Sequence, residues 1–220
     1  MRTAPWGALF DWDGVIIDSA AHHEKSWEYL AKEEKRTLPK DHFRRGFGMK
    51  NEKIIPELLQ WTSDASEIQR FSLRKEALYR EILGEHGLIP LPGARNWLEK
   101  LQRAGIPCAI GSSTHRANID LCLALMDLKG CFQCIVTAED VRKGKPDPEV
   151  FLTGAQRLGI VAKRCVVFED AHVGIQAALA GGMKVVGVAT THSATNLPGA
   201  HKVVHQLDEL NVEELSGWFA

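Results

Sequence analysis

The sequence predicts an α/β fold with a doubly wound, Rossmann-like parallel sheet and an all-helical cap inserted after the first strand. From residue 90 onward, short apolar segments alternate with helical segments of about a dozen residues, which is typical of parallel sheets with helices on both faces. Residues 20–89 are instead charged and helix-like, and no strand pattern interrupts them. We therefore expect a core formed by residues 1–19 and 90–220, and a helical cap formed by residues 20–89.

The expected elements follow in order along the chain. Residues 7–11 form the first strand, because Ala8-Leu9-Phe10 is an apolar run of the buried type. The cap contains helical patterns in HHEKSWEYLAKEEKR and ASEIQRFSLRKEALYREIL. Helices are then expected over 92–105, 115–128, 146–159 and 171–182, and strands over 106–113, 134–140, 165–170, 183–190 and 201–207.

The composition is that of a soluble globular protein. The chain has 220 residues, is 45% hydrophobic and carries a formal net charge of −1, which gives no reason to expect nucleic acid or membrane as a partner. No signal-peptide pattern or membrane-length apolar run is present, so we expect a cytoplasmic protein, as a monomer or weak homodimer. The five cysteines, including the Cys131-x-x-Cys134 pair, are interpreted as reduced core residues rather than as a zinc or redox site.

Polar residues gather where the expected strands end. Because the carboxyl ends of parallel strands form the ligand-binding edge of such sheets, these residues should lie close together. They are acids after the first and fourth strands, hydroxyls after the second, and a lysine held between Gly144 and Pro146 after the third: Asp11, Asp13, Ser112, Ser113, Thr114, Lys145, Glu169 and Asp170.

This set of residues suits phosphate chemistry. Carboxylates are hard oxygen ligands that bind Mg²⁺ together with substrate phosphate. A lysine and hydroxyls beside helix N-termini would hold phosphoryl oxygens, and a carboxylate facing phosphorus could act as a nucleophile. Any one of these acids taken alone is more often a turn or helix cap, so the interpretation depends on the whole set.

The order of these motifs resembles the haloacid dehalogenase superfamily, mostly Mg²⁺-dependent phosphatases and phosphomutases. The resemblance covers nearly the whole chain and rests on D-W-D-G-V at 11–15, Ser112, K-G-K-P-D-P at 143–148, and E-D at 169–170 followed by GIQAALAGGM. The helical insert resembles the cap of that family. The founding dehalogenases need no metal and lack the second aspartate, so Asp13 and Asp170 favour phosphoryl transfer.

The resemblance implies a role for each matching residue. Asp11 would be the nucleophile that forms an aspartyl-phosphate, and Asp13 would be the general acid and base. Ser112 and Lys145 would position the phosphoryl group. The expected Mg²⁺ ligands are the carboxylates of Asp11 and Asp170 and the backbone carbonyl of Asp13, with Glu169 as a ligand or as a partner of the ligands.

Substrate contacts are less sharply indicated. We expect Ser113, Arg116, His23 and Lys50 to contact substrate, although a solvated surface or cap packing is the alternative for the last three. DSAAHHEKSW at 18–27 resembles the start of the beta-phosphoglucomutase cap. That group carries an arginine in a G-x-S-R stretch where this chain has GFGMKNE at 46–52. GMKNE with GSSTHRANI resembles plant and bacterial phosphatases, including those of riboflavin synthesis.

The sequence therefore predicts a Mg²⁺-dependent phosphatase for a small phosphorylated metabolite. A beta-phosphoglucomutase-like sugar phosphomutase is one alternative. A non-catalytic phosphate- or nucleotide-binding module is another, although no G-x-G-x-x-G or Walker motif supports it. A phosphonate hydrolase would need a Schiff-base lysine from the cap, and the sequence singles out no such lysine.

Overall fold

The computed structural model describes residues 6–46 and 49–220, which fall into two compact units. The core unit consists of Met1–Asp18 and Ile89–Ala220, and the helical unit consists of Ser19–Leu88. Residues 47 and 48, the second and third of the GFGMKNE motif, lie outside the described residues.

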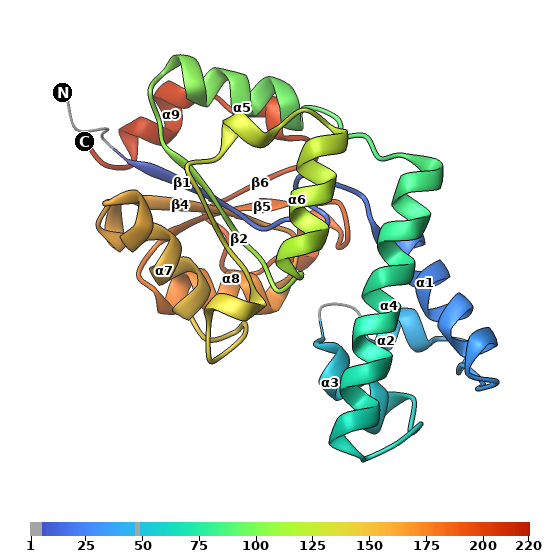
Figure 1. Ribbon diagram of the computed structural model, residues 1–220. Coiled ribbons are helices and arrows are strands. Elements are labelled where there is room, and N and C mark those ends of the chain that lie inside the picture. Colours follow the sequence, from blue (N-terminus) through green and yellow to red (C-terminus); the bar gives the residue numbers. More distant parts are fainter. Residues whose placement is uncertain (1–5, 47–48) are drawn as a thin grey trace. The chain divides into compact units, whose positions relative to one another are not determined.

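A six-stranded parallel sheet forms the centre of the core unit (Figure 1). Its strand order is β3-β2-β1-β4-β5-β6, so the first strand of the chain lies inside the sheet and has a neighbour on each side. The strands are β1 (Gly7–Phe10), β2 (Cys108–Gly111), β3 (Cys134–Val136), β4 (Cys165–Glu169), β5 (Lys184–Val188) and β6 (Lys202–Val204). The predicted parallel α/β fold is confirmed.

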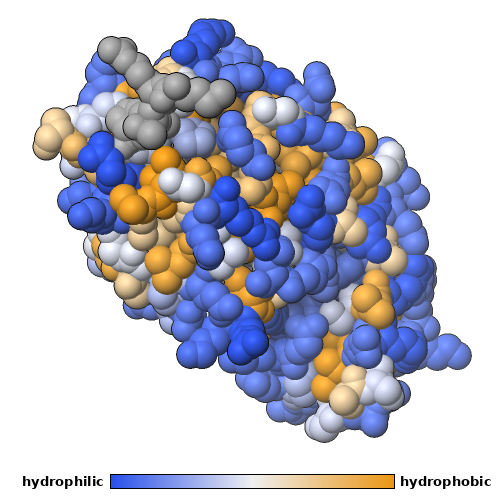
Figure 2. Space-filling model, turned by 60° about the vertical axis from the view of Figure 1, so that its left-hand side comes forward, coloured by the Kyte–Doolittle hydropathy of each residue, from blue (hydrophilic) through white to orange (hydrophobic). Residues whose placement is uncertain are grey.

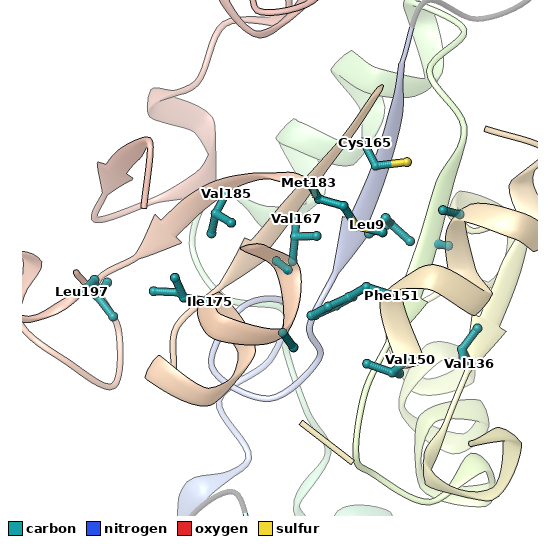
Figure 3. Close-up of a cluster of buried hydrophobic side chains, with 14 residues drawn as sticks. Leu9, Val136, Val150, Phe151, Cys165, Val167, Ile175, Met183, Val185 and Leu197 are labelled. Carbon is teal, nitrogen blue, oxygen red and sulfur yellow. The ribbon is translucent and has the colours of Figure 1, made fainter. Parts of the chain in front are cut away.

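One face of the sheet packs against α7 (Glu149–Leu158) and α8 (His172–Ala180). Leu9, Val167 and Val185 point to this face from three neighbouring strands, and Phe151 of α7 and Ile175 of α8 pack against them (Figure 3). All five side chains are completely buried. Burying a side chain of this size contributes roughly 1.5–3 kcal/mol, so this layer fixes the sheet against both helices.

The opposite face is covered by α5 (Ala94–Arg103), α6 (Arg116–Leu125) and the short α9 (Val212–Gly217) (Figure 1). Residues next to those of the first layer point here, because side chains alternate along a strand. Phe10 stacks on Phe168 with ring centroids 4.5 Å apart, and Trp97 of α5 meets Phe168 edge-on at 6.0 Å. Aromatic packing therefore joins β1 and β4 to the second helical layer.

The helical unit contains α1 (Ala20–Glu33), α2 (His42–Gly46), α3 (Asn51–Lys53), a π-helical turn at Ile54–Leu58, and the long α4 (Ala65–His86). α1 and α4 pack along each other. Trp61, which precedes α4, meets both Trp27 of α1 and Phe71 of α4 edge to face in the buried core of this unit. Asp64 begins α4 by accepting a hydrogen bond from the Glu67 N–H, which satisfies one free donor of the first turn.

The surface is mainly hydrophilic on the face drawn in Figure 2, with hydrophobic residues interspersed. Within the described ranges, no helix has the length and apolar character needed to cross a bilayer. All five cysteines are free thiols: Cys108, Cys122 and Cys165 are buried, whereas Cys131 and Cys134 are half-buried.

Candidate active site

The first strand delivers Asp11 to a tight turn. The Asp11 N–H donates to the Phe168 carbonyl at 2.9 Å, so pairing with β4 continues one residue beyond Phe10. Gly14 follows with a φ of 81°, a left-handed conformation that favours glycine. A Cβ at Gly14 would overlap the Asp170 carboxylate, so glycine allows this turn to approach the end of β4.

Asp11 and Glu169 lie next to each other because Phe10 is in register with Phe168 in the parallel pair β1–β4. Lys145 lies between their carboxylates. Its Nζ donates to Asp11 Oδ1 at 2.7 Å and to Glu169 Oε2 at 2.8 Å. The lysine side chain is only 7% exposed, which makes both ion pairs strong relative to surface pairs. The structure thus brings together the predicted nucleophile, the predicted lysine and one predicted acid.

The acids at this edge repel one another. Burial, then the negative charge of Glu169, raise the pKa of Asp11 to about 7. Burial, and then the charge of Asp11, raise the pKa of Asp170 to about 6. Burial also raises the pKa of Glu169 to about 7, although Lys145 opposes this shift. The pKa of Lys145 is raised despite its burial, because two carboxylates stabilise its charge.

This cluster has the donor set of a divalent-cation site. One carboxylate oxygen from each of Asp11, Glu169 and Asp170 lies within 4.8 Å of the others. Asp170 Oδ2 is buried and has no hydrogen-bond partner among the residues described. A cation would satisfy this oxygen and offset the mutual repulsion of the acids, and hard carboxylate ligands fit Mg²⁺.

Glu169 is already well bonded without a metal. Its Oε1 accepts from the N–H groups of Asp170 and Ala171 at 3.1 and 3.0 Å, and Oε2 accepts from Lys145. A Cβ at Gly174 of α8 would overlap this carboxylate, so glycine provides the space in which Glu169 is buried. These contacts favour a supporting role for Glu169 beside the two aspartates over direct metal coordination.

Asp13 has a separate partner. Its Oδ2 accepts a hydrogen bond from Thr114 Oγ1 at 2.5 Å, and it is not part of the carboxylate cluster. Ser112 is buried after β2, and its Oγ accepts from the Thr114 N–H at 3.0 Å. The segment after β2 therefore meets the turn after β1, as expected for two neighbouring strand ends.

The expected substrate contacts differ in their surroundings. Ser113 lies half-buried beside Ser112. Arg116 is exposed, and its Nε donates to Asp120 one turn later in α6 at 3.0 Å. Lys50 precedes α3 in the helical unit and is partly exposed. Substrate contact by these residues stays a prediction.

His23 belongs to a polar cluster that the sequence does not single out. Lys75 of α4 is 3% exposed, and its Nζ donates to His23 Nδ1 at 2.6 Å. The same Nζ pairs with Glu76 Oε1 at 3.0 Å and lies 5.6 Å from the Trp27 ring centroid and 5.5 Å from that of Tyr79. The Lys75 amine is therefore held between a carboxylate, an imidazole and two aromatic rings within the helical unit.

Glu76 completes this cluster. It is 6% exposed and accepts from Asn51 Nδ2 at 2.8 Å, and Asn51 also donates to Ser72 at 3.1 Å. Burial opposes ionisation of Glu76, but Lys75 and the other partners outweigh it and lower the pKa to about 2. The helical unit therefore contains an ion pair inside its apolar core.

Comparison with known proteins gives a consistent set of relatives. A sequence model of haloacid dehalogenase-like hydrolases matches residues 7–182. The chain is 38% identical over 212 residues to the chloroplastic 5-amino-6-(5-phospho-D-ribitylamino)uracil phosphatase of Arabidopsis thaliana, which covers 95% of this chain but 56% of that protein. It is 32% identical over 208 residues to hexitol phosphatase A of Escherichia coli, with 94% and 93% covered.

Among solved structures, a beta-phosphoglucomutase from Clostridium difficile is similar to this chain, with a TM-score of 0.83 and 26% sequence identity. The match covers 97% of this chain and 96% of that one. The relatives thus comprise named phosphatases and a named mutase on one fold.

Proposed function

The chain belongs to the haloacid dehalogenase-like hydrolase family, and from that premise we propose that it is a phosphatase for a small phosphorylated metabolite. The observation that carries this proposal is the Asp11 carboxylate at the end of β1, bonded to Lys145 and adjacent to Glu169 and Asp170. A carboxylate held in this way, among groups suited to bind phosphoryl oxygens, is fit to attack phosphorus.

In the proposed reaction, an Asp11 carboxylate oxygen attacks the phosphorus of the substrate. The bond from phosphorus to the leaving oxygen breaks, and Asp13 gives its proton to that oxygen. Lys145 and Ser112 hold the equatorial phosphoryl oxygens, whose negative charge they stabilise. The product of this step is an aspartyl-phosphate and a free alcohol.

The second step regenerates the enzyme. A water molecule attacks the phosphorus of the aspartyl-phosphate, and Asp13 accepts a proton from that water. The bond between phosphorus and the Asp11 oxygen breaks, which releases inorganic phosphate and restores the carboxylate. Asp13 is again protonated, so protons and electron pairs balance over the cycle.

Asp11 and Asp170, with the backbone carbonyl of Asp13, would hold Mg²⁺. When bound, this cation would neutralise charge on the phosphoryl oxygens and so allow one anion to approach another. Glu169 would keep Lys145 charged and in place, because its carboxylate accepts from that lysine at 2.8 Å.

The relatives suggest a substrate class. The named substrates of the Arabidopsis and Escherichia coli proteins are a phosphorylated ribityl compound and hexitol phosphates, which share a linear polyol chain. We therefore extend the proposal to phosphate monoesters of linear sugar alcohols.

The test is phosphate release with Mg²⁺ from a panel of esters. The panel contains ribitol 5-phosphate, sorbitol 6-phosphate, 5-amino-6-(5-phospho-D-ribitylamino)uracil, AMP and β-D-glucose 1-phosphate. We expect release from the polyol phosphates to be faster than from the nucleotide and the pyranose ester.

Two results would contradict the proposal. Conversion of β-D-glucose 1-phosphate to glucose 6-phosphate with little phosphate release would identify a mutase, the alternative that the Clostridium difficile structure favours. If no ester of the panel releases phosphate and the protein nevertheless binds phosphate, the protein is a binding module.

Magnesium binding should stabilise the protein more at higher pH. The pKa values of Asp11, Glu169 and Asp170 are raised in the folded state, so without metal their contribution to stability is greatest below about pH 4 and declines as pH rises to about 7. A cation binds the ionised forms and reverses this loss. The difference in Tm between Mg²⁺ and EDTA should therefore grow between pH 5 and pH 8.

The control for this measurement is Asp170→Asn, which removes one ligand and one buried charge. In this variant the difference in Tm should be small at every pH. A difference that is equally large at pH 5 and pH 8 in the wild-type protein would argue against a metal site at these carboxylates.

A further inference from the structure

A threonine that the proposed reaction does not use makes a direct contact with one of its main participants. Thr114 Oγ1 donates to Asp13 Oδ2 at 2.5 Å, and the two residues are 101 positions apart in the sequence. The contact lies within the core unit, between the segments that follow β1 and β2.

The backbone of Thr114 is anchored independently of its side chain. Its N–H donates to Ser112 Oγ at 3.0 Å, and the Ser112 N–H donates to the Val136 carbonyl of β3 at 3.0 Å. Ser112 is 2% exposed. The hydroxyl of Thr114 is therefore presented to Asp13 from a fixed position, and a change confined to the side chain leaves the Ser112 contact in place.

We propose that Thr114 is a positioning residue, which fixes the orientation of the Asp13 carboxyl group for proton transfer. This inference rests on the proposed function, in which Asp13 protonates the leaving oxygen. A hydrogen bond to Oδ2 restricts rotation of the carboxyl plane and so sets the direction in which Oδ1 points. General acid catalysis requires that direction, because the donor has to lie within hydrogen-bond distance of the leaving oxygen.

The hydroxyl suits both protonation states of its partner. Oδ2 can accept from this hydroxyl whether Asp13 is ionised or protonated, because the proton that is transferred lies on Oδ1. Thr114 can therefore hold Asp13 throughout the cycle, while the transferred proton goes to the leaving oxygen in the first step and comes from water in the second.

Leaving groups of different basicity distinguish a positioning role of Thr114 from a merely structural role. An alkoxide is strongly basic and needs its proton as the bond to phosphorus breaks, whereas p-nitrophenolate is a weak base and leaves without one. A misplaced Asp13 should therefore slow formation of the aspartyl-phosphate from ribitol 5-phosphate much more than its formation from p-nitrophenyl phosphate. Hydrolysis of the aspartyl-phosphate is the same for both esters, so the comparison uses kcat/KM, which reports only the steps up to departure of the leaving group.

The experiment compares kcat/KM of three single variants with that of the wild-type enzyme on these two esters. Thr114→Val removes the hydroxyl and keeps the shape of the side chain. We expect it to lower kcat/KM for ribitol 5-phosphate by about 10- to 100-fold, and kcat/KM for p-nitrophenyl phosphate by less than about threefold. Thr114→Ser retains the hydroxyl and should restore most of the loss. Thr153→Val makes the same chemical change in the middle of α7 and should match wild type.

Each other outcome has a definite meaning. Equal losses of kcat/KM on both esters, or a loss that Thr114→Ser does not restore, would overturn the positioning role. An unchanged or raised kcat/KM for ribitol 5-phosphate in Thr114→Val would show that the contact does not assist Asp13. If the wild-type enzyme hydrolyses neither ester, the proposed function fails as well, a result that differs from active enzyme without leaving-group dependence.

Discussion

Asp11→Asn should lower the rate of phosphate release by about 10⁴-fold or more, because the amide that replaces the carboxylate is a poor nucleophile. The side chains have nearly the same shape, so the fold should be retained. The variant also removes one charge from a buried cluster of acids, in which burial and Glu169 already raise the pKa of Asp11. Without metal, its Tm should therefore be at least that of the wild-type protein.

The measurement is phosphate release by Asp11→Asn beside Asp127→Asn, which makes the same change at an exposed position with a φ of 52° that asparagine tolerates. Mass spectrometry of the intact protein verifies that the asparagine has not been deamidated. A verified Asp11→Asn protein with wild-type turnover would refute the assignment of the nucleophile.

Lys75→Met should lower the free energy of unfolding of the helical unit by about 3–5 kcal/mol, because it leaves Glu76 charged and buried without its main partner. Lys75 and Glu76 are 3% and 6% exposed, so water cannot replace the lost contact. In the variant, the Glu76 carboxylate still accepts a hydrogen bond from Asn51, so the expected loss lies within this range rather than above it.

The pH dependence of this loss has a defined sign. The folded-state pKa of Glu76 is lowered to about 2, so the stability contributed by the pair is fully present above pH 4.5, its usual pKa, and is lost as pH falls toward 2. The deficit of Lys75→Met relative to wild type should therefore be largest near pH 7 and should shrink below pH 4.5.

Hydrogen exchange of the amides in α1 and α4 measures this effect in the full chain. Lys32→Met, on the exposed side of α1, is the matched control and should change the protection of these amides by little. Lys75→Met combined with Glu76→Gln should recover part of the loss, because the buried charge is then removed as well. A Lys75→Met variant with wild-type protection of both helices would show that the buried pair does not stabilise this unit.

The strands were predictable because strands of a sheet covered on both faces are apolar at nearly every position. The segments CVVFE and KVVGV can be recognised as strands without knowing which strands they pair with. The first strand was predicted one residue too long, since Asp11 continues the pairing with β4 only through its N–H. No pattern in the sequence predicts α9, because its six residues form too short a segment for a recognisable period.

The candidate site was predictable as far as the acids and the lysine, because strand ends are positions that the sequence itself marks. The contact between Thr114 and Asp13 depends on how two turns meet, which local patterns do not contain. The Lys75–Glu76 pair was missed for a different reason. In SLRKEALYRE the charged residues resemble a solvated helix face, and two of them are buried because α1 and α3 pack against α4.

The position of β1 inside the sheet has a consequence for synthesis on the ribosome. This strand is made first, yet it pairs with Cys108–Ile110 and Cys165–Phe168, which are made much later. At typical translation rates, about 8 to 30 s pass between the synthesis of β1 and that of β4. The helical unit is continuous in sequence and so can fold during this interval. Meanwhile the apolar segment from Trp6 to Phe10 is without its neighbours, and is the part of the nascent chain that chaperones would be expected to shield.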